Sequence, residues 1–275
     1  FTGPMAGKKI QRLIVTHHHP DHVGLAGWFQ KEYKVSLWMT RTAWLTARML
    51  RLDEQEVPPP ETIEFWTQAG MCSDIMEERK SGKPFNFADA VSALPLGFRR
   101  IVDNEEIEIG NRIWKVRVGN GHAPEHATLW SNVDDIVIAG DQIISSISPN
   151  LGVYATEPNA NPVKEWIDTC HKLSAFASDK HLTLPGHKLP FTGLKFRLKQ
   201  MVENHELALN RLVNFLEKPH TAEECFSILF GKSIQKSEYG LALVEAVAHV
   251  NYLYLEGTVS RVLDKNGAFR YQALS

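Results

Sequence analysis

The sequence of 275 residues predicts an α/β fold in which metal-ligand residues gather where strands end. An apolar run at Ile10–Val15 precedes a histidine-rich segment, and a helical pattern follows at Val23–Phe29. Alternating strand patterns occur at 105–118 and 127–139. The last third of the chain carries amphipathic helical patterns, of which the longest spans 194–217. Strands therefore alternate with helices, and the chemistry is expected at their junctions.

The histidine-rich segment reads Thr16-His-His-His-Pro-Asp-His22. Alternate residues of an extended segment point the same way, so His17 and His19 are placed to share one metal. Pro20 redirects the chain, which places Asp21 and His22 beside a second metal. Two metals about 3.5–4 Å apart form a clamp for hydrolytic chemistry. A histidine-rich loop or a tag remnant is the alternative, and the interrupting Pro and Asp and the flanking patterns disfavour it.

The region from 41 to 98 differs in character from the strand-rich parts of the chain. After a strand at 33–39, helices are expected at 44–50, 61–69 and 72–80, with Pro58–Pro60 ending the first of them. Aromatic and methionine residues are frequent throughout. We interpret the region as an insertion that packs onto the main body, and as a lid that gives an apolar wall to a pocket beside the metals.

Three later strand patterns each end at a glycine followed by a ligand-type residue. A hairpin at 105–118, turning at Gly110-Asn111, runs toward His122, the strand at 135–139 runs into Asp141, and a short strand at 180–185 precedes His187. An aspartate directly after a buried strand is costly unless it is paired or bound to a cation. Each of these three residues alone is weak evidence for a metal site, because the chain has 12 histidines. Their shared position after a strand and a glycine makes them candidate ligands.

As a set and in this order, these motifs resemble the metallo-β-lactamase superfamily over residues 10–191, and within it the glyoxalase II-like and lactonase-like branch. The resemblance implies a four-layer αβ/βα sandwich with metals at one sheet edge. It implies a domain at 1–192, with the lid insertion at about 41–98, followed by a C-terminal module at 193–275. Relatives carry a strand-rich segment before the histidine motif, so we expect an N-terminally incomplete chain with an exposed sheet edge.

The resemblance also implies the ligand set. One metal is held by His17, His19 and His122, the other by Asp21, His22 and His187, with Asp141 bridging both. His18 matches a variable position, and His126 matches a position outside the ligands, where a structural hydrogen bond is expected. Nitrogen and oxygen donors without a thiolate suit zinc first, with manganese or iron as alternatives. The missing Cys ligand departs from the main lactam-hydrolysing members and disfavours antibiotic hydrolysis.

The sequence is compatible with three functions. The first is a hydrolase of an ester, thioester or lactone with an apolar moiety, in which a metal-bridging hydroxide attacks the carbonyl carbon. Asp21 and Asp141 are its catalytic carboxylates, and Asn150 and Tyr154 contact the substrate. The second is a phosphodiesterase or ribonuclease, for which Lys188 is the best single phosphate-binding candidate. The third is a metal-stabilised sensor or scaffold, which the complete ligand set disfavours.

The C-terminal part resembles a winged-helix module. A helix at 194–217 precedes a capping box at Thr221–Glu224, a helix at 238–255 and a hairpin at 259–273. The segment from 220 onward contains five basic and six acidic residues, so it lacks the positive excess that phosphate binding needs. We therefore expect a small-molecule substrate, no nucleic acid, and a packing or dimerisation module compatible with a homodimer.

Composition sets the remaining expectations. A formal net charge of −2 and 43% hydrophobic residues are ordinary for a globular protein. No apolar run approaches the roughly 20 residues of a membrane span. Three widely spaced cysteines indicate reduced thiols, and hence a cytoplasmic protein. The first residues do not form a signal peptide.

Overall fold

The computed structural model describes residues 3 and 6–274, so the ends of the two expected domains lie outside the described residues. Within it the chain forms two compact units. The first consists of the chain up to Glu54, with 85–119 and 123–140, and the second of 55–84, 120–122 and 141 onward. The domain boundary expected at 192 stays a prediction, as does the four-layer arrangement.

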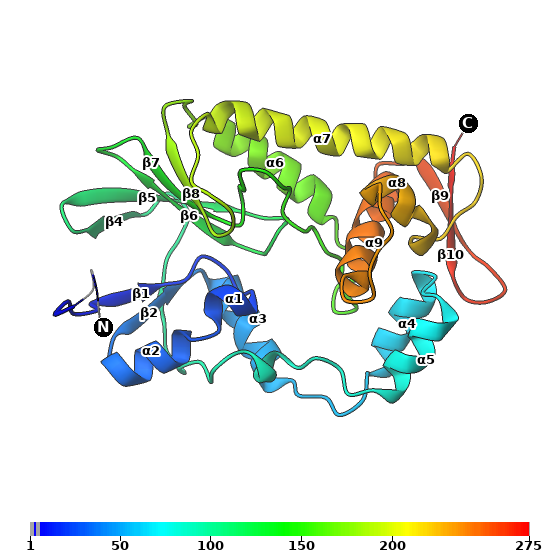
Figure 1. Ribbon diagram of the computed structural model, residues 1–275, viewed down its shortest axis with the longest axis horizontal. Coiled ribbons are helices and arrows are strands. Elements are labelled where there is room, and N and C mark those ends of the chain that lie inside the picture. Colours follow the sequence, from blue (N-terminus) through cyan, green and yellow to red (C-terminus); the bar gives the residue numbers. More distant parts are fainter. Residues whose placement is uncertain (1–2, 4–5, 275) are drawn as a thin grey trace. The chain divides into compact units, whose positions relative to one another are not determined.

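The first unit begins with a small parallel sheet covered by helices. Its strands are β1 (Arg12–Ile14), β2 (Ser36–Met39) and β3 (Arg99–Arg100), hydrogen-bonded in this order. Its helices are α1 (Pro20–Val23), α2 (Ala26–Tyr33), α3 (Arg41–Leu52) and the 3-10 turn η2 (Phe87–Asp89). Leu37 and Met39 are buried in a core with Ala43, Trp44 and Ala47 of α3. One face of the sheet therefore packs on helices, as Figure 1 shows.

An antiparallel sheet packs on the other face. Its strands in this unit are β4 (Glu106–Ile109), β5 (Arg112–Gly119), β6 (His126–Ser131) and β7 (Ile136–Gly140), paired in chain order. A second core contains Trp114, Val116 and Leu129 from this sheet, with Ile14 and Trp38 of β1 and β2 packed against it. Trp38 thus points away from its neighbours Leu37 and Met39, as the alternation of a strand requires. The unit has three layers.

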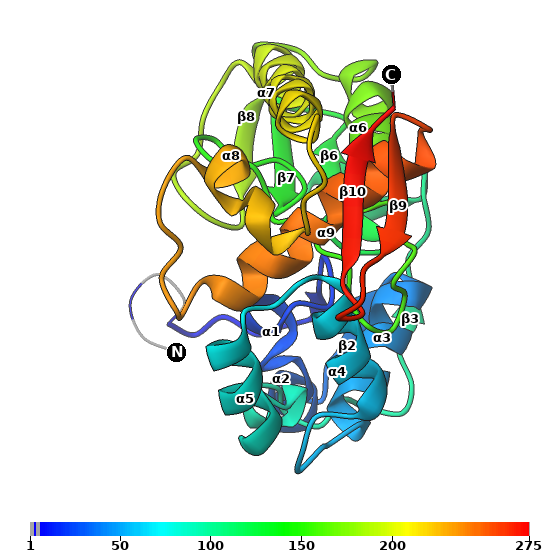
Figure 2. The same cartoon turned by 90° about the vertical axis from the view of Figure 1, so that its right-hand side faces the viewer.

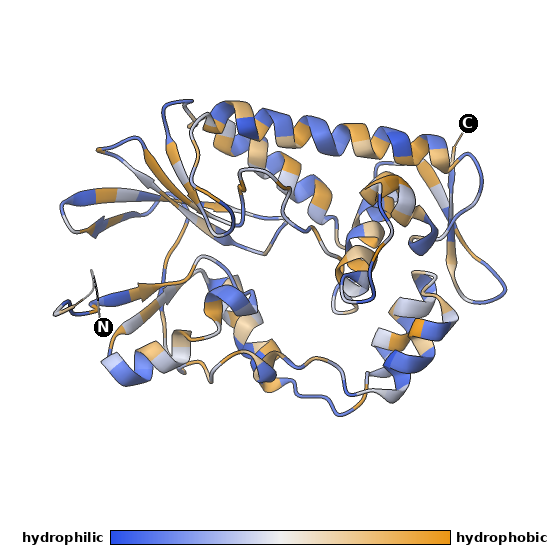
Figure 3. Ribbon diagram, viewed as in Figure 1, coloured by the Kyte–Doolittle hydropathy of each residue, from blue (hydrophilic) through white to orange (hydrophobic). Residues whose placement is uncertain are grey.

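The second unit is mainly helical. Its elements are α4 (Pro60–Gln68), α5 (Ser73–Ser81), α6 (Pro162–Ser174), β8 (Leu182–Pro185), α7 (Leu194–Phe215), η3 (Glu223–Cys225), α8 (Phe226–Phe230), α9 (Tyr239–Leu255), β9 (Val259–Leu263) and β10 (Phe269–Ala273). Helix α7 shows mixed polar and apolar positions, whereas α9 is largely apolar (Figure 3) and mostly buried. Strands β9 and β10 form an antiparallel hairpin, best seen in Figure 2.

Most expected elements are confirmed, including the capping box. The Thr221 N–H donates to Glu224 Oε2 at 2.8 Å, and the Glu224 N–H donates to Thr221 Oγ1 at 3.3 Å. Each side chain thus satisfies a backbone donor at the start of a helical segment. The predicted α/β class is confirmed as well. Among the described residues, no helix combines the length and apolarity that crossing a bilayer requires.

One expectation about the helices was wrong, and one helix was not predicted. Pro58–Pro60 do not end α3, which stops at Leu52. Pro60 is instead the first residue of α4, where its missing N–H has no helical partner to lose. Helix α6 was not expected at all, although Asn161 caps it by accepting a hydrogen bond from the Lys164 N–H at 3.3 Å.

Candidate metal centre

The first unit positions the histidine-rich segment at the end of β1. The Val15 N–H donates to the Trp38 carbonyl oxygen at 3.0 Å, which keeps the chain extended to the edge of the motif. His17 is fully buried, and its Nδ1 lies 3.0 Å from Thr16 Oγ1. Its ring centroid lies 4.7 Å from that of His19 and 4.2 Å from that of His22. The imidazoles of the motif therefore converge.

Helix α1 then carries the acidic residue of the motif. His19 is its N-cap and Pro20 its first residue, with the His22 N–H donating to the His19 carbonyl oxygen at 3.0 Å. Proline fixes the backbone in a helical φ, so Asp21 and His22 fall in the first turn. The Asp21 side chain is 54% exposed, and its Oδ2 lies 3.4 Å from His22 Nε2. Asp21 is thus the candidate carboxylate that a substrate reaches from solvent.

In the second unit, two histidines face one buried carboxylate. His187 Nε2 lies 3.2 Å from Asp141 Oδ2, and His122 Nε2 lies 3.7 Å from the same oxygen. The Asp141 side chain is only 6% exposed. An aspartate this deeply buried needs cationic or hydrogen-bonding partners. The two imidazoles approach this carboxylate from different parts of the chain.

A glycine with a positive φ precedes His122 and sets its direction. Gly121 has a φ of +97°, and a Cβ built on it would lie 2.3 Å from Trp166 Cβ and 2.6 Å from the Trp166 backbone nitrogen. Only glycine fits this close approach to α6. The Trp166 indole N–H donates to the Gln142 carbonyl oxygen at 3.2 Å, next to Asp141. Helix α6 therefore supports both the His122 turn and the Asp141 strand end.

Helix α9 supports His122 from the other side. His122 Nδ1 lies 2.9 Å from the Asn150 carbonyl oxygen, which accepts a hydrogen bond from the Nδ1–H and leaves Nε2 for a metal. The Asn150 side-chain amide donates to Glu245 Oε2 at 2.6 Å and to the Leu241 carbonyl oxygen at 3.3 Å. Glu245 was not predicted from the sequence, although a lone carboxylate within an otherwise apolar helix indicates a special role. Burial raises its pKa to about 7, against a smaller lowering by the Asn150 hydrogen bond.

The remaining predicted residues lie as follows. His126 is fully buried and stacks on His17 with ring centroids 4.6 Å apart. A Cβ on Gly140 would meet the His126 ring at 2.6 Å, so this histidine packs tightly behind the motif. About half of the surface of Tyr154 is exposed, yet burial around its hydroxyl, and then the charge of Glu245, raises its pKa. His18 is half-buried, with its ring centroid 4.7 Å from that of His19.

The donor atoms of the seven predicted ligands form two groups. One consists of His17, His19 and His122, and the other of Asp21, His22, Asp141 and His187; within each, one ligand atom per residue lies within 4.8 Å of all the others. Imidazole nitrogens and carboxylate oxygens at this spacing fit divalent zinc, manganese or iron. Cys170 and Cys225 are buried elsewhere, and neither group contains a thiol.

Comparisons with known proteins agree with this architecture. Residues 5–193 match the family model described as the metallo-beta-lactamase superfamily, and residues 209–274 match that of the metallo-beta-lactamase-like C-terminal domain. The chain is 23% identical over 271 residues to "Probable metallo-hydrolase YqjP" of Bacillus subtilis (strain 168), covering 94% of this chain and 80% of that protein.

Two solved structures share the fold over almost the whole chain. A beta-lactamase domain protein from Burkholderia ambifaria is 31% identical with a TM-score of 0.86, over 97% of this chain and 76% of that one. A metallo-beta-lactamase family protein from Thermus thermophilus is 24% identical with a TM-score of 0.78, over 96% and 80%. This chain belongs to the metallo-beta-lactamase superfamily and is a metallo-hydrolase of that family.

Proposed function

We propose that this metallo-hydrolase cleaves an ester, thioester or lactone that carries an apolar moiety, at a site that holds two divalent metals. In this proposal His17, His19 and His122 would hold one metal. Asp21, His22 and His187 would hold the other, and Asp141 would contribute its carboxylate to both. The two donor groups support this assignment, because each supplies enough nitrogen and oxygen donors for one ion. Zinc is the first choice of metal.

The single observation that carries the proposal is the contrast between the two aspartates. The Asp141 side chain is 6% exposed and faces two imidazoles, as suits a carboxylate that holds metals. The Asp21 side chain is 54% exposed, so water and substrate reach it. Two carboxylates with such different surroundings suit two different roles. Asp141 assembles the site, and Asp21 works at its open side.

When bound at these residues, two divalent ions would supply Lewis-acid chemistry, lowering the pKa of a water and polarising a carbonyl oxygen. Asp21 accepts a hydrogen bond from the attacking water and orients its lone pair toward the carbonyl carbon. His122 keeps its orientation because its Nδ1 proton is held by the Asn150 carbonyl oxygen. Tyr154, whose pKa is raised by burial and by the charge of Glu245, donates a hydrogen bond to the substrate from its hydroxyl.

Zinc-loaded protein should hydrolyse acyl thioesters, esters or lactones in preference to a bis-aryl phosphodiester. Asp21→Asn should lower kcat by roughly 100-fold and also weaken binding of the second metal, because it removes the carboxylate that would hold that metal and orient the water. The matched control is Asp74→Asn, an exposed aspartate of α5. Turnover of the phosphodiester alone would favour a phosphodiesterase. No turnover of any substrate by the metal-loaded protein would favour a sensor or scaffold.

A further inference from the structure

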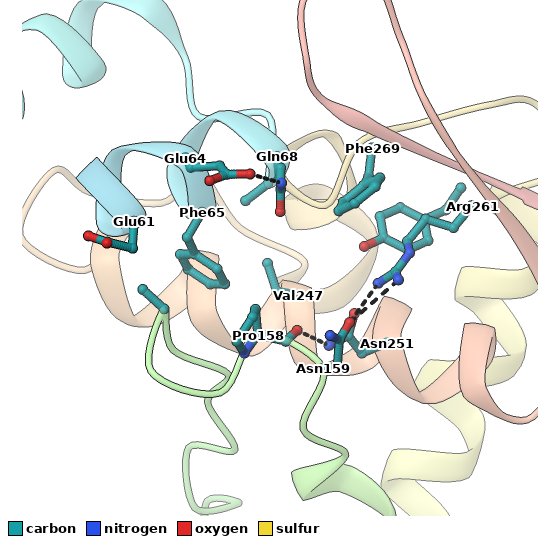
Figure 4. Close-up of a pocket in the computed structure, with 13 residues that line it drawn as sticks. Glu61, Glu64, Phe65, Gln68, Pro158, Asn159, Val247, Asn251, Arg261 and Phe269 are labelled. Carbon is teal, nitrogen blue, oxygen red and sulfur yellow. Dashed lines mark hydrogen bonds between the residues drawn. The ribbon is translucent and has the colours of Figure 1, made fainter. Parts of the chain in front are cut away.

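A cavity of about 390 Å³ lies wholly within the second unit, and none of the seven proposed ligands lines it. Its walls come from α4, α9, the β9–β10 hairpin and the loop at 155–159, as Figure 4 shows. Concave sites built from several chain segments are the usual form of a small-molecule pocket. This cavity is therefore a candidate binding site outside the metal centre.

The middle of the cavity is apolar. Phe65 of α4 and Val247 of α9 line it and are 6% and 5% exposed, and Phe269 of β10 adds a second aromatic ring. In Figure 4 the Phe65 ring and Val247 lie between the charged residues at the two sides. A ligand therefore gains by placing an apolar group at the centre of the cavity.

Opposite charges stand on opposite sides of the cavity. Glu61 of α4 and Arg261 of β9 both line it, and Figure 4 shows them at its two sides. The Arg261 guanidinium carbon lies 4.1 Å from the Tyr254 ring centroid and 4.5 Å from that of Phe269, which holds it in place. Within the described part of the chain, neither Glu61 nor Arg261 forms an ion pair. The polar partner of the Arg261 guanidinium in the cavity wall is Asn159, whose Oδ1 accepts from Nη1 at 3.5 Å and from Nη2 at 3.4 Å.

A buried amide oxygen supplies a third anchor. Asn251 of α9 lines the cavity and is only 1% exposed. Its Nδ2 donates to the Pro158 carbonyl oxygen at 2.9 Å and to the Ala160 carbonyl oxygen at 3.3 Å, which fixes the orientation of the amide. Its Oδ1 has no hydrogen-bond partner among the described residues. A buried acceptor left unpaired is costly, so a ligand that donates an N–H is favoured.

We propose that this cavity binds a short zwitterionic peptide of two or three residues with apolar side chains. Its ammonium end pairs with Glu61, its carboxylate end pairs with Arg261, and a peptide N–H between them donates to Asn251. An apolar side chain packs on Phe65 and Val247. A free α-amino acid carries its ammonium and its carboxylate on the same carbon atom, so its two charged groups are too close together to pair with both sides of the cavity. A linear ω-amino acid reaches both sides but has no internal N–H donor.

The test uses the full zinc-loaded chain, dileucine as the probe and isothermal titration calorimetry. Two end-blocked peptides serve as matched probes: N-acetyl-dileucine lacks the ammonium, and dileucine amide lacks the carboxylate. Dileucine should bind in a saturable manner, and blocking either end should weaken binding by roughly tenfold. Because these comparisons use the unmodified protein, they do not depend on how any variant folds.

Variants then assign each end to its side chain. With Glu61→Gln, acetylation should cause no further loss, and with Arg261→Gln, amidation should cause none, because each pair has already been broken. Arg211→Gln, on the exposed side of α7, is the matched control and should bind all three peptides like the unmodified protein. Equal binding of the three peptides, or no saturable binding of dileucine, would overturn the proposal.

Discussion

The carboxyl of Glu245 gives the sharpest test of how the second unit is built. It accepts a hydrogen bond from Asn150 Nδ2 at 2.6 Å, and burial raises its pKa from 4.5 to about 7. Glu245→Gln keeps an oxygen that accepts the Asn150 hydrogen bond and removes the ionisable group. The substitution therefore isolates the free-energy cost of a buried charge.

The sign and size of the effect follow from linkage. The folded state favours the protonated carboxyl, because the folded pKa lies above the unfolded value. Stability is therefore lost as pH rises from 4.5 to 7, and the loss is constant above 7. The difference between these pKa values corresponds to about 3 kcal/mol at 1.36 kcal/mol per pH unit. Glu245→Gln should thus stabilise the protein by up to about 3 kcal/mol at pH 8 and change little at pH 4.5.

Urea unfolding followed by tryptophan fluorescence, at pH 4.5 and 8 with zinc held constant, measures this difference. The control is Glu206→Gln, an exposed glutamate of α7, which should show no such dependence on pH. If Glu245→Gln has the same effect at both pH values, or is less stable than the unmodified protein at pH 8, the carboxyl is not buried as described.

Four further outcomes are expected. Thr221→Ala removes the acceptor for the Glu224 N–H and should cost about 1 kcal/mol of unfolding free energy, measured in urea. Gly121→Ala forces a Cβ onto Trp166 at a positive φ and should cost roughly 3 kcal/mol or more, seen as a lower Tm. Asn150→Ala releases the loop that orients His122 and should weaken zinc binding roughly tenfold in a chelator competition, whereas an unchanged affinity would contradict that role. Chelation of the metals should lower Tm and abolish hydrolysis, and added zinc should restore both.

Local patterns in the sequence predicted much of the fold. The alternation in β2 is confirmed by Leu37 and Met39 facing helices while Trp38 faces the second sheet. The capping box at Thr221 is confirmed because both of its hydrogen bonds join residues three apart. The start of α6 could have been found from Asn161 and Pro162, which cap a helix with apolar residues at 163, 166, 170 and 173.

Contacts between distant segments could not be predicted. The bond from Asn150 to Glu245 joins residues 95 positions apart, and no spacing rule connects a loop amide to one carboxylate of a later helix. The three proline residues at 58–60 were ambiguous for a different reason. Proline is disfavoured in helix interiors but is common in the first turn of a helix. The prolines at 58–60 were therefore compatible both with the end of α3 and with the start of α4.

The acceptor for His122 Nδ1 is a main-chain oxygen. Every residue type at position 150 would offer the same backbone oxygen. The tautomer of the His122 imidazole therefore depends on where the loop backbone runs and not on which side chain residue 150 carries. Side chains along the loop are therefore able to diversify toward new substrates while the imidazole keeps its protonation pattern, provided that α9 continues to hold the loop in place.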